Sequence, residues 1–242
     1  MRAEVHPKGV EIVTVCLEVT GAETARPYIE AAHPEHPSLI DVAHEMDSKF
    51  GVVNIPNGVW IDENGMIVRP AEPASSGAPV AQRRTRGPVT NDPRLAKLDE
   101  LVATRISTDR DRYSAAIRDW AEKGAASEYV LSPDEVIARS IPRPAEVAEA
   151  AAHFELAEHL WRQGARDAAL AQFRQAHRLQ PDNWTYKRQA WSLVSAETDG
   201  DNPMARFQQW PKLGHEDEWP FESDWLRDVE KLGPGQYYPQ SW

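Results

Sequence analysis

The stretch of residues 51–69 constrains the fold most, because it has the pattern of two short strands joined by a tight turn. Val59–Ile61 and Ile67–Val68 are made of β-branched and aromatic residues, which favour strands. Asn64–Gly65 lies between them and can supply the two positive-φ positions of a type I′ hairpin turn. Pro56 cannot donate to a strand ladder and therefore fits the entrance of the first strand. The sequence predicts a β-hairpin here.

The residues before this hairpin indicate an α/β unit. Residues 10–19 first alternate and then become almost continuously apolar, as in a strand that is buried on both faces. Pro27 suits the first position of a short helix, and residues 39–41 suggest a further extended piece. Ala43–Phe50 has the pattern of a helix, and Gly51 can cap its C-terminus.

The order Val52-x-x-Ile55-Pro56, apolar strand, glycine turn, strand resembles the C-terminal hairpin of thioredoxin-like proteins. The nearest group is the ResA/TlpA-type redoxins, which are also described as AhpC/TSA-like. The resemblance spans about the first 70 residues. It implies a thiol–disulfide oxidoreductase in which Pro56 is cis and faces a Cys-x-x-Cys motif. It also implies that Ile55 and Pro56 bind the substrate, which would be a protein thiol, a protein disulfide or a peroxide. An ordinary hairpin with a trans proline is the alternative.

The sequence contains one cysteine, Cys16, and therefore no Cys-x-x-Cys motif. A cysteine in the middle of an apolar strand behaves as a small hydrophobic residue, so we expect a structural role, with a redox role as the alternative. A single cysteine excludes an internal disulfide framework, which fits a reducing, cytoplasmic compartment. In the redoxin family the reactive cysteine or selenocysteine precedes a strand such as 10–19. The resemblance therefore implies that this chain alone is inactive.

Residues 71–94 change in character, because prolines and a Ser-Ser-Gly run replace the strand pattern. This composition predicts a linker or a long solvated loop. The segment also contains a small basic cluster, for which contact with an anion or a partner is the alternative: Arg83, Arg84 and Arg86.

Helical patterns dominate from residue 95 to residue 198. Apolar residues at 3–4 spacing predict two helices between 95 and 124, separated at 107–109. Ser132 begins a capping box that predicts a helix to about Arg139. A further helix is expected over 184–197.

Residues 150–183 resemble one tetratricopeptide repeat, a helix-turn-helix of about 34 residues. Because a single repeat cannot bury both of its faces, the helices of 95–139 and of 184–197 are expected to stack against it. A generic helical hairpin is the alternative. The small and large packing residues of the repeat pattern are Leu156, Ala157, Leu160, Gly164, Ala169, Phe173, Ala176 and Pro181.

The segment 199–242 is acidic and aromatic. Its rings cannot all remain in water, since large exposed apolar patches are rare on monomers. The tail either wraps back over the helical region or forms an interface for another chain. Ser223 or Asp224 is expected to cap a short helix over 225–232. The rings concerned are Phe207, Trp210, Trp219, Phe221, Trp225, Tyr237, Tyr238 and Trp242.

The composition excludes several classes of function. A net charge of −11 argues against nucleic-acid binding, and no apolar run approaches the ~18 residues that span a bilayer. We find no phosphate-binding glycine loop and no Ser/His/Asp set, so no cofactor is expected. Three histidines lack zinc-type spacing, so we expect no metal and place them in loops or on a helix surface. Asp41 and Glu45 have the spacing of an ordinary exposed acid pair. The histidines are His33, His36 and His44.

These observations predict an incomplete α/β thioredoxin-like domain over 1–70 and an all-α, TPR-like region over 95–198, followed by the acidic aromatic tail. They leave two hypotheses. In the first, the chain is a selenoprotein-like redoxin of cell redox homeostasis, an antioxidant whose reactive Cys or Sec is missing from these residues. A UGA codon taken as a stop, with Met1 as a restart, would explain the loss. In the second, the chain is a complete, non-catalytic adaptor whose helical region binds a peptide or protein.

Overall fold

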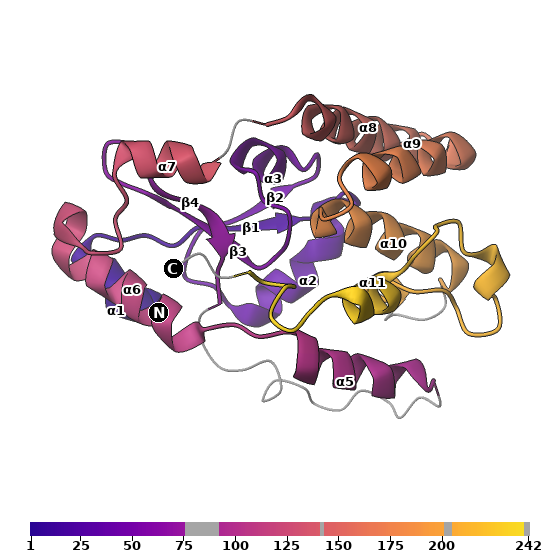
Figure 1. Cartoon of the computed structure of the whole chain (residues 1–242), viewed down its shortest axis with the longest axis horizontal. Helices are drawn as coiled ribbons and strands as arrows, with labels where there is room; N and C mark the ends of the chain where they lie inside the picture. Colours follow the sequence, from indigo (N-terminus) through magenta and orange to yellow (C-terminus); the bar gives the residue numbers. More distant parts are fainter. Residues whose placement is uncertain (76–91, 141–142, 201–204, 240–242) are drawn as a thin grey trace.

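The computed structural model describes residues 1–75, 92–140, 143–200 and 205–239. The protein combines two small sheets with many helices, a mixed α/β part and a helical part (Figure 1). The strands are β1 (Thr14–Leu17), β2 (Ser38–Asp41), β3 (Asn57–Ile61) and β4 (Ile67–Pro73). The α-helices are α1 (Arg2–Val5), α2 (Ala22–Ala32), α3 (Glu45–Phe50), α5 (Arg94–Arg105), α6 (Arg110–Lys123), α7 (Pro133–Ser140), α8 (Ala145–Arg162), α9 (Arg166–Leu179), α10 (Trp184–Thr198) and α11 (Trp225–Lys231). Short 3₁₀ turns are η1 (His6–Lys8), η2 (Gly124–Ala126), η3 (Ala205–Phe207) and η4 (Glu216–Glu218).

Strands β1 and β2 pair in parallel, with Cys16 opposite Ile40, and α2 connects them. The expectation of a strand over 10–19 that is buried on both faces is wrong in extent and in burial. The strand covers four residues whose side chains are exposed or half-buried, and Val13 just before it is 50% exposed. The reason is that this sheet has only two strands in the described part of the chain, so it lacks the covering layers of a large parallel sheet.

Strands β3 and β4 form the predicted antiparallel hairpin, with Ile61 paired to Ile67. The predicted type I′ turn is wrong, because Gly65 has φ +78° whereas Asn64 does not have a positive φ. The side chain of Asp62 organises the turn instead. Its carboxylate accepts hydrogen bonds from the backbone N–H groups of Asn64 (2.9 Å) and Met66 (2.8 Å). A three-residue type I turn followed by a left-handed glycine is another common hairpin connection.

Two helices flank β2. Pro27 does not begin a helix, as the sequence suggested, but lies inside α2, which starts five residues earlier. The helix α3 ends at Gly51, whose φ of +73° confirms the predicted glycine cap. Asp41 holds the other end of α3, because its carboxylate accepts hydrogen bonds from the N–H groups of Glu45 (3.1 Å) and Met46 (2.7 Å). Asp41 is therefore a capping residue, not half of an exposed acid pair.

Helices α6 and α7 belong with the hairpin. The ring of Trp60 on β3 stacks on Trp120 of α6 at 4.9 Å, and its indole N–H donates to the hydroxyl of Tyr113 (3.2 Å). The buried guanidinium of Arg69 on β4 makes a bidentate pair with Glu72, with both N–O distances 2.7 Å. The break between α5 and α6 falls at residues 106–109, as predicted, and Ser132 makes the predicted capping box with Glu135 before α7.

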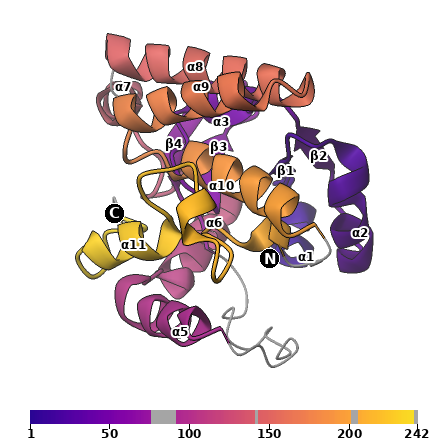
Figure 2. The same ribbon diagram turned by 90° about the vertical axis from the view of Figure 1, so that its right-hand side faces the viewer.

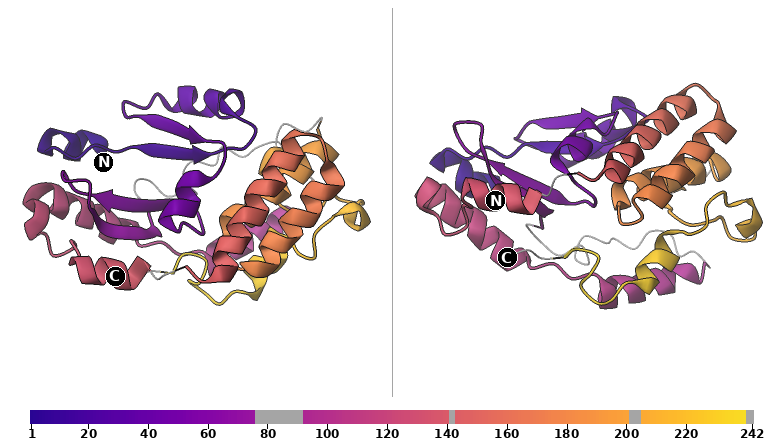
Figure 3. Two further views of the ribbon diagram at one scale, coloured as in Figure 1. Left: turned by 90° about the horizontal axis from the view of Figure 1, so that it is seen from above. Right: turned by 45° about the horizontal axis from the view of Figure 1, so that its top comes forward.

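Helices α8 and α9 form an antiparallel pair that turns at Gly164, where φ is +78°, and α10 packs against α9 (Figure 2). Phe154, Trp161 and Phe173 fill the space between them. The helices of 95–139 do not stack on this pair, contrary to our expectation. Helix α5 lies beside α11, far from α8 (Figures 1 and 2), and α7 packs on β4. The strands lie to one side of the α8–α9 pair (Figure 3), and α3 reaches α8 through His44 and Phe154.

The tail packs against the helical part of the chain. For the described rings this supports the first of its two predicted roles, wrapping back over the helical region. Asp224 is the residue that caps α11, since its side chain accepts from the N–H of Arg227. The ring of Phe207 remains 46% exposed. Arg83, Arg84, Arg86 and Trp242 lie outside the described residues. In the described part, no helix combines the length and the hydropathy that a membrane span requires. The buried rings of the tail are Trp210, Phe221, Trp225, Tyr237 and Tyr238.

Candidate functional site

Residues 53–56 form the loop that leads into β3, and they include both predicted substrate-binding residues. The peptide bond between Ile55 and Pro56 is cis. Both residues are on the surface, with Ile55 38% exposed. The carbonyl of Val53 accepts hydrogen bonds from the first two N–H groups of α10, those of Trp184 (2.6 Å) and Thr185 (3.3 Å). These N–H groups have no partner within their own helix, so the loop satisfies them.

The C-terminal tail covers the same loop. The hydroxyl of Tyr238 donates to the carbonyl of Ile55 (2.7 Å), and the side-chain amide of Asn54 donates to the carbonyl of Tyr237 (2.8 Å). The N–H of Ile55 donates to the side chain of Asn54 (2.9 Å). Both backbone polar groups of Ile55 are therefore engaged within the chain.

A second group of polar side chains is buried where α3 meets α8. The Nδ1 atom of His44 lies 2.9 Å from a carboxylate oxygen of Asp47, and its Nε2 atom lies 3.7 Å from a carboxylate oxygen of Glu158. The three residues are 2%, 2% and 1% exposed. His44 was expected on a surface, and that expectation is wrong. It adopts a left-handed backbone with φ +53°, which is uncommon for a residue other than glycine.

Burial and charge shift the protonation of this group. Burial raises the pKa of Glu158 to about 8, while the nearby charges of His44 and Arg162 act in the opposite direction. Burial tends to lower the pKa of His44, but the hydrogen bond to Asp47 and the negative charges of Asp47 and Glu158 outweigh it, so the pKa is raised. Near neutral pH the protonated, uncharged form of Glu158 is therefore favoured, and the contact with Asp47 favours the protonated form of His44.

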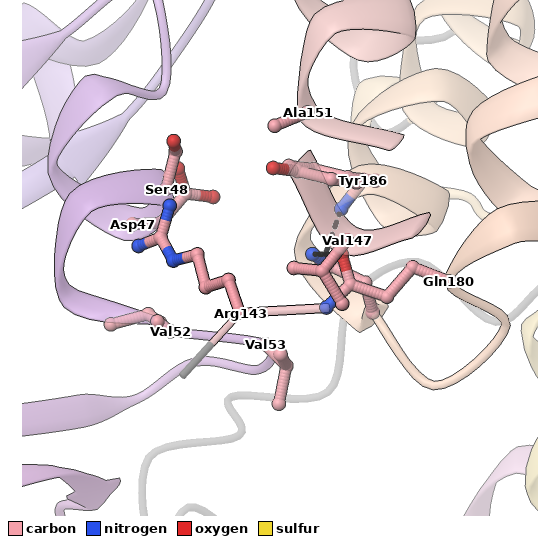
Figure 4. Close-up of a pocket in the computed structure, with 11 residues that line it drawn as sticks. Asp47, Ser48, Val52, Val53, Arg143, Val147, Ala151, Gln180 and Tyr186 are labelled. Atoms are coloured by element: carbon pink, nitrogen blue, oxygen red, sulfur yellow. Dashed lines mark hydrogen bonds between the residues drawn. The ribbon is translucent and has the colours of Figure 1, made fainter. Parts of the chain in front are cut away.

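Two hollows adjoin this group. One, of about 340 Å³, is lined by His44, Lys49, Glu155 and Tyr186, with Phe154 as an apolar wall. The other is only about 20 Å³, close to the minimum for one water molecule. Figure 4 shows its lining, with the side chain of Arg143 extending toward α3 and Tyr186 facing it from α10. Both hollows lie at the junction of the α/β part with the helical part.

The remaining predicted candidates are dispersed. Cys16 is half-buried in the β1–β2 sheet, whereas Pro56 directly precedes β3 in the other sheet. His33 ends α2 and is exposed, and His36 lies 3.2 Å from the hydroxyl of Thr14. Within the described residues, no group of three or more His, Cys, Asp or Glu side chains is arranged to hold a metal ion.

The buried group was missed, although α8 carries a signal for it. The buried residues of this helix recur at helical spacing, and Glu158 stands one turn after Phe154 on the same face. A carboxylate on the apolar face of a helix requires a partner, because an unpaired buried charge is costly. That partner is His44, which is 114 residues earlier, and nothing in the local sequence indicates it.

Comparison with known proteins adds no assignment. No family model matches the chain, and no curated protein or solved structure matches it.

Proposed function

We propose that the chain is the substrate-binding and helical part of a thiol–disulfide oxidoreductase of the redoxin type. In such an enzyme a thiolate or selenolate attacks one sulfur of a substrate disulfide, and the other sulfur leaves as a thiolate. The reactive group is not among these 242 residues, whose one cysteine lies on β1. The proposed setting is the reducing cytoplasm, where a lone cysteine remains a thiol.

The order and pairing of the elements support this proposal. A parallel pair (β1 and β2) is joined by a helix and is followed by a short helix and an antiparallel hairpin, β3–β4. The loop that enters the hairpin presents Ile55 and Pro56 at the surface. This is the order that the resemblance to ResA/TlpA-type redoxins implies after the reactive motif. The exposed Ile55–Pro56 pair at the start of β3 is the observation that carries the proposal.

In this proposal the two residues have separate roles. The backbone of Ile55 pairs with an extended segment of the substrate, as a strand edge does. Pro56 has a fixed φ, so its ring limits how close the substrate backbone can approach. Because it lacks an N–H group, Pro56 does not compete with Ile55 for the hydrogen bonds of the substrate. The start of α10 supports the loop through two hydrogen bonds to the carbonyl of Val53. The repeat-like pair α8–α9 would give the enzyme a surface for a protein partner.

The nucleotide sequence upstream of the Met1 codon tests the proposal directly. We expect it to encode, in frame, a β-strand followed by Cys-x-x-Cys, or by the same motif with a UGA codon at one cysteine position. A protein extended by that segment should reduce insulin disulfides with dithiothreitol as the electron source, and P56A should slow it. The chain as given should show no turnover. An upstream region without such a motif, or a folded extended protein without activity, refutes the proposal.

A second candidate is a non-catalytic adaptor, and one observation favours it. The backbone groups of Ile55 are already engaged by Asn54 and Tyr238, so the loop offers no free edge in this conformation. An adaptor would bind a peptide or protein without any thiol chemistry. A stable partner recovered with the purified chain, together with an upstream region that lacks the motif, would support this candidate over the first.

A further inference from the structure

We infer that the surface around residues 53–55 is a binding site for an aromatic peptide segment that begins with a turn, and that the chain's own residues 235–238 occupy it as an intramolecular ligand. The part of the inference that concerns substrate access rests on the proposed function. The binding site itself rests only on the contacts that follow.

The tail is held at this surface by a backbone contact from α5. The N–H of Gly235 donates to the carbonyl of Arg105 (3.2 Å) at the end of α5. The guanidinium of Arg105 in turn donates to the carbonyl of Leu232 (2.6 Å). Reciprocal bonds of this kind fix the direction in which the tail leaves α11. They carry its next residues toward the loop at 53–55.

Aromatic side chains form the floor of the site. The ring of Tyr237 meets the ring of Trp184 edge-on, with centroids 4.8 Å apart. The indole N–H of Trp225 donates to the hydroxyl of Tyr237 (2.9 Å). Tyr237 is 3% exposed and Tyr238 is 9% exposed, although both lie near the end of the chain. Buried aromatic anchors with satisfied polar tips are typical of the centre of a protein–protein interface.

The loop makes two polar contacts with the tail, one to the main chain and one to a side chain. The amide of Asn54 donates to the main-chain carbonyl of Tyr237, a group that every peptide has. The carbonyl of Ile55 accepts from the hydroxyl of Tyr238. A peptide in trans could make the first contact with any sequence and the second with a tyrosine or another donor. The site therefore favours a segment with two adjacent aromatic residues, the second one a tyrosine, in the turn-and-bend conformation of residues 234–238.

Occupation by the tail has a direct consequence for access. The tethered segment competes at an effective concentration in the millimolar range, as expected for a ligand on a short linker. A separate peptide, or a substrate, that approaches the carbonyl of Ile55 from the side of Tyr238 has to displace that tyrosine. In the redoxin proposal, this makes the tail an autoinhibitory segment.

The test uses the full-length chain and a fluorescent peptide with the sequence of residues 233–239. Wild-type protein should show no saturable binding below about 1 mM, because the tail competes. The variant Y237A/Y238A, which frees the site, should bind the peptide at least about tenfold more tightly in a fluorescence anisotropy titration. Adding N54A to that variant should weaken binding about fivefold, since it removes one hydrogen bond. A peptide with both tyrosines replaced by alanine is the matched control.

The variant Y238F covers the case in which Y237A/Y238A loses its wild-type circular dichroism spectrum. It keeps the ring and removes only the hydroxyl, so the peptide should bind it about fivefold more tightly than the wild type. Equal binding to wild type and to a folded variant overturns the inference. This readout involves no redox chemistry. Peptide binding without an upstream motif would therefore refute the proposed enzyme and leave the binding site supported. An upstream motif with activity but no peptide binding would refute the binding site and leave the proposed enzyme supported.

Discussion

Replacing Glu158 by glutamine should flatten the pH dependence of the protein's stability. Burial raises the pKa of Glu158 from 4.5 to about 8, so between these two values the folded chain holds a proton that the unfolded chain has released. The free energy of unfolding therefore falls as the pH rises through this window, by about 1.4 kcal/mol per pH unit for one proton. Between pH 5 and pH 7.5 the loss that comes from Glu158 is about 3 kcal/mol. Glutamine resembles the protonated acid in shape and does not titrate.

His44 acts with the same sign. Its pKa is raised in the folded protein, so its contribution to stability is complete below the ordinary value and is lost as the pH rises through the folded value. His44 titrates in both the wild type and E158Q, but the substitution also removes the charge of Glu158 that helps raise the pKa of His44. The difference between the two proteins therefore reports the carboxyl group of Glu158 together with its coupling to His44.

The assay is urea unfolding followed by tryptophan fluorescence, at half-unit steps from pH 5 to pH 7.5. E158Q should gain about 3 kcal/mol relative to the wild type over this range. E155Q is the matched control, because Glu155 lies about one turn before Glu158 on the same helix and is exposed. E155Q should follow the wild type. Parallel curves for wild type and E158Q would show that Glu158 is ionised in the folded protein, and the reasoning would be wrong.

Three further substitutions test the packing. G58A should lower the free energy of unfolding by about 1–3 kcal/mol in urea titrations, because a Cβ atom would lie 2.5 Å from the hydroxyl of Tyr113. An unchanged unfolding midpoint would show that Gly58 and Tyr113 are not in such close contact. E72A should cost about 3–5 kcal/mol, since it leaves the buried charge of Arg69 without its bidentate carboxylate, and the apolar pair R69M/E72L should recover most of that loss. N183A should lower stability by about 1 kcal/mol through the lost cap of α10, measured by thermal unfolding.

Local signals in the sequence identified most of the elements. The hairpin β3–β4, the α5–α6 break, the capping box of Ser132 and the glycine cap at Gly51 all depend on residues within a few positions of one another. Such short-range rules act before any tertiary contact forms. The errors at Asn64 and Pro27 are also local. The side chain of Asp62 can organise a turn other than type I′, and a proline can be tolerated inside a helix. The sequence could not rank these alternatives against the predicted ones.

The candidate sites were harder to predict, because they depend on which elements meet. The pairing of His44 with Glu158 requires that α3 packs on α8, and the covering of Ile55 by Tyr238 joins residues separated by 183 positions. The mispredicted stacking of 95–139 has the same origin. Helix α5 had an apolar face in the sequence, but only the fold shows that α11 of the tail covers it.

The loop at 53–55 connects these observations. Each of its three residues makes a hydrogen bond to the helical part or the tail: Val53 to the start of α10, Asn54 to Tyr237, and Ile55 to Tyr238. The conformation of the loop is therefore set by segments more than a hundred residues away in sequence. A peptide made only from the α/β part would lose all of these bonds. We expect residues 53–55 to adopt a different conformation in it than in the full chain. Any function of Ile55 and Pro56 has to be measured with the helices and the tail in place, because those segments control access to them.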